Sequence, residues 1–155
     1  MRYRLFRPED FAQIYAIEEA CFQPPVRFPR AYMRQLVRSD DTATWVAEDD
    51  SGVAGFAIVE WASIANEVVA YIQTIEVAPE QRRKGVGMEL LRRMEESARA
   101  AEATQIWLHV DVANDAAIRL YRAQGYEKRG TEEHYYARNR AAEIYSKELE
   151  PAKAK

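Results

Sequence analysis

The chain has 155 residues, 48% of them hydrophobic and 30% charged, which suits one folded domain with a substantial core. Its 22 basic and 25 acidic side chains leave a net charge of −3, which argues against a general nucleic-acid binder. The single cysteine, Cys21, excludes an internal disulfide framework and favours a reducing compartment, here the cytoplasm. With only two histidines beside one cysteine, no metal site is expected.

The N-terminal residues do not suggest a signal peptide. Residues 1–6 lack the apolar core of a signal peptide, and no apolar run reaches membrane-spanning length, so no membrane partner is expected. Residues 1–150 are expected to form a single domain. The short polar tail over residues 151–155 is expected to be disordered.

The predicted elements follow the order strand, two helices, three strands, helix, strand, helix and two strands. Their expected ranges are 3–5, 8–21, 30–38, 42–48, 53–61, 68–77, 85–101, 105–110, 114–124, 126–131 and 141–149. Residues 132–140 are predicted to form a polar, aromatic loop between the last two strands. This order mixes hairpins with strand–helix–strand units, so we expect an α+β fold whose mixed sheet has helices on both faces.

Several boundaries follow from local chemistry. Pro24 and Pro25 cannot stay helical in succession, so they separate the first two helices. Residues 49–52 supply turn chemistry between two strands, which predicts a hairpin. Asn114 is expected to cap the last helix, and Gly125 to end it.

The stretch 71–88 indicates a strand, a basic glycine turn and the start of a helix. Pro79 ends the strand, and the apolar positions change to helical spacing after the turn. A helix N-terminus with two glycines and three neighbouring basic side chains is expected to bind a phosphate or pyrophosphate. The alternative is a solvated basic turn in which the glycines only make the bend.

Two well-known phosphate loops are excluded. The GxxxxGK[ST] run of a P-loop is absent. The dinucleotide fingerprint needs a third glycine where this chain has Leu90.

Two spaced motifs together resemble the GCN5-related N-acetyltransferases (GNAT). Arg82-x-x-Gly85-x-Gly87 is similar to the family's [QR]-x-x-G-x-[GA] pyrophosphate motif. Asn114-Asp115-Ala116-Ala117-Ile118-Arg119-Leu120-Tyr121-x-x-x-Gly125-Tyr126 resembles its N-A-x-x-L-Y-x-x-x-G-[FY] run. The resemblance implies a mostly antiparallel sheet of about seven strands with about four helices, and acetyl-CoA as cosubstrate.

The resemblance also implies which residues meet the cofactor. Ile75 and Val77 would pair with the pantetheine arm like an added strand, and the Val77 N–H would serve as oxyanion donor. Tyr121 would protonate the departing thiolate, or only pack against the cofactor and donate a hydrogen bond. The full expected set is Ile75, Glu76, Val77, Arg82, Arg83, Lys84, Gly85, Val86, Gly87, Met88, Asn114 and Tyr121.

Within the family, the chain is most similar to protein N-terminal acetyltransferases of the RimI and NatE types. Tyr71-Ile72-x-Thr74, Leu108-His109-Val110 and Tyr135-Tyr136 resemble the NatE pattern, whereas RimI-type enzymes carry a glutamate where His109 stands. An α-amino group has a pKa of about 7.7–8.0, against about 10.4 for a lysine, so a weak base acting through one water suffices.

Tyr71 and His109 are therefore the expected holders of that water. The alternatives are that His109 is a core histidine bonded to backbone and that Tyr71 only packs. Glu76 and Asp111 are acidic competitors. A regular strand would turn Glu76 to the face opposite Ile75 and Val77, and Asp111 is expected on an alternate face from His109.

The resemblance places the substrate N-terminus between two loops. The expected lining residues are Pro24, Pro25, Val26, Phe28, Tyr135 and Tyr136. The predicted function is acetyl transfer from acetyl-CoA to a protein or peptide N-terminus, by direct attack through a tetrahedral intermediate. A GNAT that acetylates a lysine side chain or a small amine is one alternative, and a non-catalytic acetyl-CoA-binding regulator is another. The protein is expected to be a monomer or homodimer.

Overall fold

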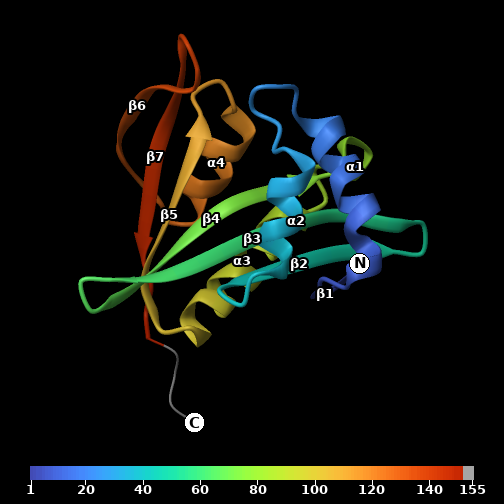
Figure 1. Cartoon of the computed structure of the whole chain (residues 1–155), viewed down its shortest axis with the longest axis horizontal. Coiled ribbons are helices and arrows are strands. Elements are labelled where there is room, and N and C mark those ends of the chain that lie inside the picture. The colour runs from blue at the N-terminus through green and yellow to red at the C-terminus, as the bar shows by residue number, and fades with distance from the viewer. Residues whose placement is uncertain (152–155) are drawn as a thin grey trace.

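Seven strands form one sheet, in the order β1-β2-β3-β4-β5-β7-β6, in the computed structural model, which describes residues 1–151 (Figure 1). The strands are β1 (Arg2–Leu5), β2 (Thr42–Asp49), β3 (Gly52–Ile64), β4 (Glu67–Val77), β5 (Ala103–Asp111), β6 (Glu127–Ala137) and β7 (Arg140–Glu148). Only β4 and β5 pair in parallel, so the predicted mixed, mostly antiparallel sheet is confirmed. Apart from Pro151, the predicted tail lies outside the described residues.

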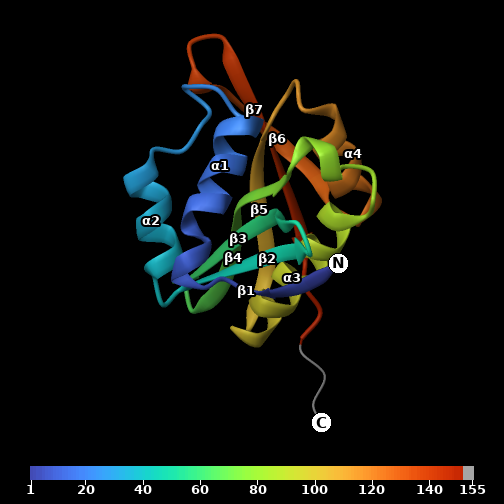
Figure 2. The same ribbon diagram turned by 90° about the vertical axis from the view of Figure 1, so that its right-hand side faces the viewer.

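Four helices cover the two faces of this sheet. They are α1 (Phe11–Cys21), α2 (Arg30–Arg38), α3 (Val86–Ala100) and α4 (Asp115–Ala123), with short 3-10 turns at Pro8–Asp10 and Pro79–Gln81. Figure 2 shows α1 and α2 on one side of the sheet and α3 and α4 on the other, as predicted. No helix within the described range has the length and apolar character needed to cross a membrane.

Each face of the sheet has its own core because strand side chains alternate. On β3, Phe56 and Ile58 are fully buried beneath α1 and α2, whereas Ala57 and Val59 are buried beneath α3. The α3 side is the larger core. Its fully buried large side chains are Leu90, Leu91, Met94, Ile106, Leu108 and Tyr145.

The predicted loop over residues 132–140 is wrong. Strand β6 continues to Ala137, and β7 begins at Arg140, so the segment is a long hairpin that rises at the top of Figure 1. The pairing of β6 with β7 shifts between Glu132 and Ala137, and His134 has a φ of 58°. This irregular, exposed edge lacks the apolar alternation that marks a strand in a sequence.

A bulge in β4 changes which side chains share a face. Opposite Ile58 and Val59 of β3, the pairing skips Gln73. Ile72 and Ile75 therefore both pack against the α3 core, while Glu76 turns towards α1, on the same face as Tyr71.

The parallel strands β4 and β5 separate beyond their shared segment. Their pairing ends at Ile72 and Leu108, although β4 continues to Val77 and β5 to Asp111. The edge of β4 from Gln73 to Val77 thus faces β5 without a strand partner. This separation opens the sheet where the site lies.

Candidate active site

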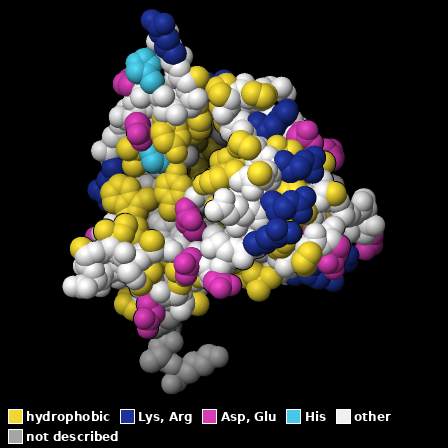
Figure 3. All heavy atoms as spheres, viewed as in Figure 1, with side chains coloured by type: hydrophobic (Ala, Val, Ile, Leu, Met, Phe, Trp, Pro, Cys, Tyr) yellow, Lys and Arg dark blue, Asp and Glu magenta, His cyan; other side chains and the backbone are white. Residues whose placement is uncertain are grey.

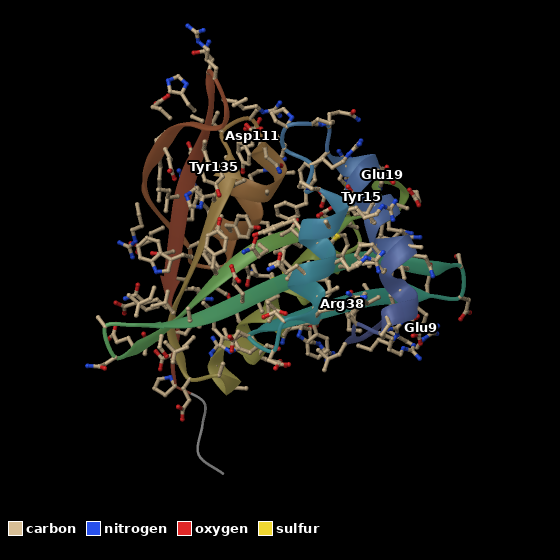
Figure 4. All side chains as sticks on the ribbon, viewed as in Figure 1. Glu9, Tyr15, Glu19, Arg38, Asp111 and Tyr135 are labelled. Carbon is tan, nitrogen blue, oxygen red and sulfur yellow. The ribbon has the colours of Figure 1, made fainter. Side chains whose placement is uncertain are left out.

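A groove of about 430 Å³ lies where β4 and β5 separate. We call it the central groove. Side chains from the α1–α2 loop, β4, β5, α4 and β6 line it. Figure 3 shows a hollow with a hydrophobic rim on this face, and Figure 4 places Asp111 and Tyr135 beside it.

Three side chains on β4, β5 and β6 form a continuous hydrogen-bonded chain in this groove. The Tyr71 hydroxyl lies 2.7 Å from Nδ1 of His109, and Nε2 of the same ring lies 2.7 Å from Oε2 of Glu132. A carboxylate can only accept, so Nε2 carries the hydrogen and Nδ1 accepts from the Tyr71 hydroxyl. Burial raises the pKa of Tyr71 far above its ordinary value, so this hydroxyl keeps its own proton at neutral pH.

The His109 ring is held on its face as well as at its nitrogens. It stacks on the Tyr135 ring with centroids 4.2 Å apart and planes 2° from parallel. The Tyr135 hydroxyl lies 3.4 Å from that of Tyr71. Both ring nitrogens are thus engaged by side chains, so His109 is not the backbone-bonded core histidine of the alternative interpretation.

The predicted water between Tyr71 and His109 needs a revision. Because both nitrogens of His109 already have partners, no ring position remains for a shared water. A water or an amine can still reach the Tyr71 oxygen, which has acceptor capacity left. Proton transfer through Tyr71 to His109 fits the contacts better than a bridging water.

The two acidic competitors are placed differently from each other. Glu76 is 3% exposed and does not line the groove, which removes it from contact with an incoming amine. Asp111 follows His109 by two residues and shares its face, so the expectation of an alternate face was wrong. Asp111 lines the groove, but its carboxylate is paired with Arg140 at 2.8 Å.

A buried pair of carboxyl groups joins α1 to β4. Glu18 is 1% exposed, and its Oε2 accepts from the Phe28 N–H at 2.9 Å, while Glu76 accepts from the Thr74 hydroxyl at 2.7 Å. The other oxygen of each carboxyl has no hydrogen-bond partner within residues 1–151. Burial, and then the nearby Glu18 carboxyl, raise the pKa of Glu76 well above its usual range, so Glu76 is the protonated member.

The walls of the groove come from the expected α1–α2 loop and from strand β6, where a second loop was predicted. Pro25, Val26 and Phe28 line one side, and Tyr135 and Tyr136 line the other, but Pro24 is outside the lining. The first wall is tied to α1, because the Tyr15 hydroxyl donates to the Phe28 carbonyl at 2.7 Å. The aromatic rings leave an apolar slot with hydroxyl groups at its edge.

The basic glycine turn has the geometry expected of an anion cradle. Gly85 is the N-cap of α3 with a φ of 79°, a left-handed conformation that favours glycine. No side chain caps this helix, so its first N–H groups are open to a ligand. A Cβ on Gly85 would meet nothing within 4 Å, so this position opens onto free space, whereas a Cβ on Gly87 would contact Leu120 at 3.5 Å and Val77 at 3.8 Å. These donors fit the pyrophosphate of acetyl-CoA.

The three basic side chains of this turn, Arg82, Arg83 and Lys84, make different contacts. Arg82 donates to the Val77 carbonyl at 3.2 Å and contacts Cys21, so its side chain folds back over the end of β4. Lys84 donates to Gln81, and Arg83 is exposed. Cys21 is half-buried, and burial raises the pKa of its thiol, which argues against a reactive nucleophile.

Two further predicted site residues, Asn114 and Tyr121, lie at the α4 side of the groove. Asn114 caps α4 as predicted, accepting from the Ala117 N–H at 3.2 Å, and it also lines the groove. Tyr121 is 6% exposed and lines the groove, and its hydroxyl makes no hydrogen bond with any described residue. Burial raises the pKa of Tyr121, so the hydroxyl keeps a proton that it can donate. Within residues 1–151, no three His, Cys, Asp or Glu side chains converge to hold a metal ion.

Two residues of the site were missed from the sequence. The sequence gives no recognisable signal for Glu132, because its segment lacks the apolar alternation that marks a strand. It does give a signal for Glu18, which is an acidic residue on the apolar side of α1 beside Ile14 and Ile17. A buried charge at helical spacing is unusual enough to have marked it.

Comparison with known proteins places the chain in a family. The model of the Acetyltransferase (GNAT) family matches residues 11–126. An N-alpha-acetyltransferase of Sulfurisphaera tokodaii is 28% identical over 145 residues, which cover 88% of this chain and 86% of that protein. A putative [ribosomal protein bS18]-alanine N-acetyltransferase of Bacillus subtilis is 29% identical over 136 residues, 88% of this chain and 87% of that protein.

A further relative matches more closely over a shorter span. The streptothricin acetyltransferase of Streptomyces lavendulae is 39% identical over 87 residues, but the match covers 56% of this chain and only 45% of that protein.

Solved structures agree with this fold. Arabidopsis thaliana NAA60 in complex with acetyl-CoA has a TM-score of 0.84 at 18% identity, over 96% of this chain and 98% of that one. Chaetomium thermophilum Naa20 in complex with a bisubstrate analogue has a TM-score of 0.81 at 25% identity, over 96% of this chain and 87% of that one. The chain therefore belongs to the GNAT family of acetyltransferases, and acetyl-CoA is its acetyl donor.

Proposed function

We propose that this enzyme acetylates the α-amino group of a protein or peptide N-terminus. The observation that carries the proposal is the Tyr71–His109–Glu132 chain, which ends in a narrow groove walled by aromatic side chains. An extended N-terminus can enter such a slot with its amine directed at the Tyr71 oxygen. The two relatives whose names specify N-terminal substrates are similar over most of their length, which supports the same class of acceptor.

The side chains provide a route for the proton that the amine must lose. Bound acetyl-CoA supplies a thioester carbonyl and a thiol leaving group. The Tyr71 oxygen accepts a proton from the attacking amine while its own proton passes to Nδ1 of His109. The resulting imidazolium keeps its Nε2–H bond to the Glu132 carboxylate, which stabilises the positive charge.

Tyr121 is the group that we assign to the leaving thiol. Its raised pKa keeps the phenol protonated, and its hydroxyl is free of bonds to described residues, so it can donate towards the groove. The Gly85–Met88 turn would hold the pyrophosphate, and the open edge of β4 would hold the amide-bearing arm.

The low basicity of an α-amine fits this arrangement. An α-amino pKa of about 7.7–8.0 leaves a useful neutral fraction near pH 7, whereas a lysine amine near 10.4 is almost wholly charged. A proton relay whose final acceptor is an imidazole is basic enough to serve an α-amine, but it is poorly suited to a lysine amine.

The deciding experiment is a substrate panel. The purified enzyme with acetyl-CoA is offered short peptides that vary at their first two residues, each also containing an internal lysine. Fragmentation mass spectrometry then locates the acetyl group, and an N-formylated copy of each peptide serves as control. Acetylation confined to free α-amines is expected. Acetyl groups found only on the internal lysine would contradict the proposal.

A small-amine acceptor is the second candidate. The segment shared with the streptothricin acetyltransferase is the observation that favours it. Streptothricin is therefore tested as an acceptor in the same assay. Turnover of streptothricin at more than about ten times the kcat/KM of the best peptide, a transition-state difference above about 1.4 kcal/mol, would favour this candidate.

A further inference from the structure

Helix α2 carries a row of arginines on its outer flank. Arg30, Arg34 and Arg38 follow one another at four-residue spacing, and the helix contains no acidic residue. Like charges at this spacing repel one another, so the row slightly destabilises an isolated helix. We call these three residues the α2 arginine row.

The row has no carboxylate partner within residues 1–151. Asp40 and Asp41 follow α2 directly, yet neither pairs with it. Several arginines on other elements are paired, as Arg4 is with Asp10 at 2.8 Å, and the α2 row differs from the other unpaired arginines in that its three members are aligned on one helix. The α2 arginine row is therefore an unneutralised positive stripe on a protein with a net charge of −3.

Two members of the row are held in place by rings of α1. The guanidinium carbon of Arg30 lies 4.5 Å from the Tyr15 ring centroid, and that of Arg34 lies 4.0 Å from the Phe11 centroid. Such stacking covers one face of a guanidinium and leaves its N–H edge for a ligand. Together with Ala31, Gln35 and Ser39, the row forms an open, solvent-facing surface on α2.

The α2 arginine row and the central groove lie on the same face of the molecule. Figure 3 shows Lys and Arg side chains in a line over α2, beside the hydrophobic rim of the groove, and Figure 4 places Arg38 on that helix in the same view. The other flank of α2 contributes Tyr32, whose hydroxyl donates to the groove residue Gln73 at 3.3 Å. Helix α2 therefore carries the arginine row on one flank and contacts the central groove with the other.

We propose that the α2 arginine row binds an acidic segment of the acceptor protein, a few residues after the N-terminus that enters the groove. This inference rests on the proposed function. At 1.5 Å per residue the row spans about 12 Å, which about four residues of extended chain can follow. Arginine forks match carboxylates in pairs, and the negative charge of the rest of the protein disfavours nucleic acid as the occupant.

The test uses two peptides that share their first four residues. In one, the next four positions are glutamate, and in the other they are glutamine. At low salt, the wild-type enzyme should acetylate the acidic peptide with a kcat/KM about tenfold higher, through KM, because each exposed ion pair contributes modestly. Added salt should reduce this preference.

The combined variant Arg30→Gln, Arg34→Gln and Arg38→Gln should lose the preference and treat the two peptides alike. A matched variant with the same change in charge, Arg2→Gln, Arg7→Gln and Arg92→Gln, removes exposed arginines outside α2 and should keep it. Arg30 and Arg34 pack on aromatic rings, so replacing them also changes packing. The single variant Arg38→Gln changes only the charge of the row, and it should lower the preference for the acidic peptide about twofold to threefold.

Fluorescence anisotropy of the labelled peptides measures docking without turnover. If neither peptide is acetylated, the proposed function fails. In that case, tighter binding of the acidic peptide by wild type than by the combined variant still supports the α2 arginine row as a binding site for acidic peptide. Equal binding of both peptides by wild type overturns the proposal. A single-stranded RNA that is bound by wild type and released by the combined variant, with no preference between peptides, would overturn it in favour of nucleic acid.

Discussion

His109 and Glu132 are hydrogen-bonded at 2.7 Å although β7 lies between their strands in the sheet. The glutamate reaches the ring from the irregular part of β6, at the point where its pairing with β7 shifts. The contact leaves Nδ1 as the acceptor for the Tyr71 hydroxyl. A charge on an edge strand thus determines which nitrogen of His109 can take a proton.

Replacing Glu132 is expected to weaken this relay. Glu132→Gln can still accept the Nε2–H bond, but it no longer balances the imidazolium charge, so kcat should fall about tenfold to a hundredfold. The KM for acetyl-CoA should stay unchanged, and the acidic limb of the pH profile should move. Glu133→Gln, an exposed neighbour, is the control. Equal kinetics for the two variants would show that Glu132 has no part in the relay.

Tyr71 and His109 are expected to act as one unit. Tyr71→Phe and His109→Ala should each lower kcat, and the double variant should lose less than the product of the single losses. Steady-state kinetics on one peptide measures this cycle. Multiplicative losses would mean that the two side chains work independently, despite their 2.7 Å contact.

Tyr121→Phe is expected to lower turnover more than cofactor affinity. The ring and its packing against Tyr126, with centroids 5.6 Å apart, remain, while the proton donor is lost. General acid catalysis contributes about 10²–10⁴-fold. Thiol release gives kcat, and calorimetry gives the affinity for acetyl-CoA. A loss in kcat of less than about threefold, with chemistry still rate-limiting, would leave Tyr121 as a packing residue.

Gly87→Glu is expected to weaken binding of acetyl-CoA. The new carboxylate would occupy the open first turn of α3 and repel the pyrophosphate, costing more than about tenfold in affinity, or about 1.4 kcal/mol. Gly87→Ala is the steric control, because its methyl group meets Leu120 only at 3.5 Å. It should bind better than the Glu variant. Unchanged calorimetric affinity of a folded Glu variant would remove the turn from the cofactor site.

The buried carboxyl pair predicts a pH-dependent stability. The fold raises the pKa of Glu76, so its contribution to stability is present at low pH and is lost as the pH rises above the unfolded pKa towards the folded one. Glu76→Gln should therefore raise the melting temperature by about 2–4 °C near pH 8, for about 1 kcal/mol in a domain of this size.

The same substitution should have little effect near pH 3, because a glutamate whose ordinary pKa is about 4.3 is then largely neutral in both states. Thermal melts at about pH 3 and about pH 8 measure the difference. Glu67→Gln, on the exposed start of β4, is the control and should show no such pH dependence. An equal effect of Glu76→Gln at both values would contradict a raised pKa of Glu76 in the folded protein.

Much of the scaffold could be predicted because its signals are local. The left-handed turn at Gly85, the cap at Asn114 and the break at the two prolines depend on the conformational preferences of single residues. The order of strands and helices predicted a mixed sheet with helices on both faces. Two motifs at the right spacing then identified the family.

The sequence by itself therefore determined the family and the local conformation of the glycine turn, because backbone preferences and period-two or period-3.6 patterns are found in consecutive residues. It also predicted that Tyr71 and His109 act together, although through a shared water and not by direct contact. Tertiary structure alone decided that Glu132 joins the relay and that Glu18 meets Glu76. Both contacts depend on a bulge, at Glu132 in β6 and at Gln73 in β4. A shift of one residue in a strand moves a side chain to the other face, and no local pattern encodes where that shift occurs.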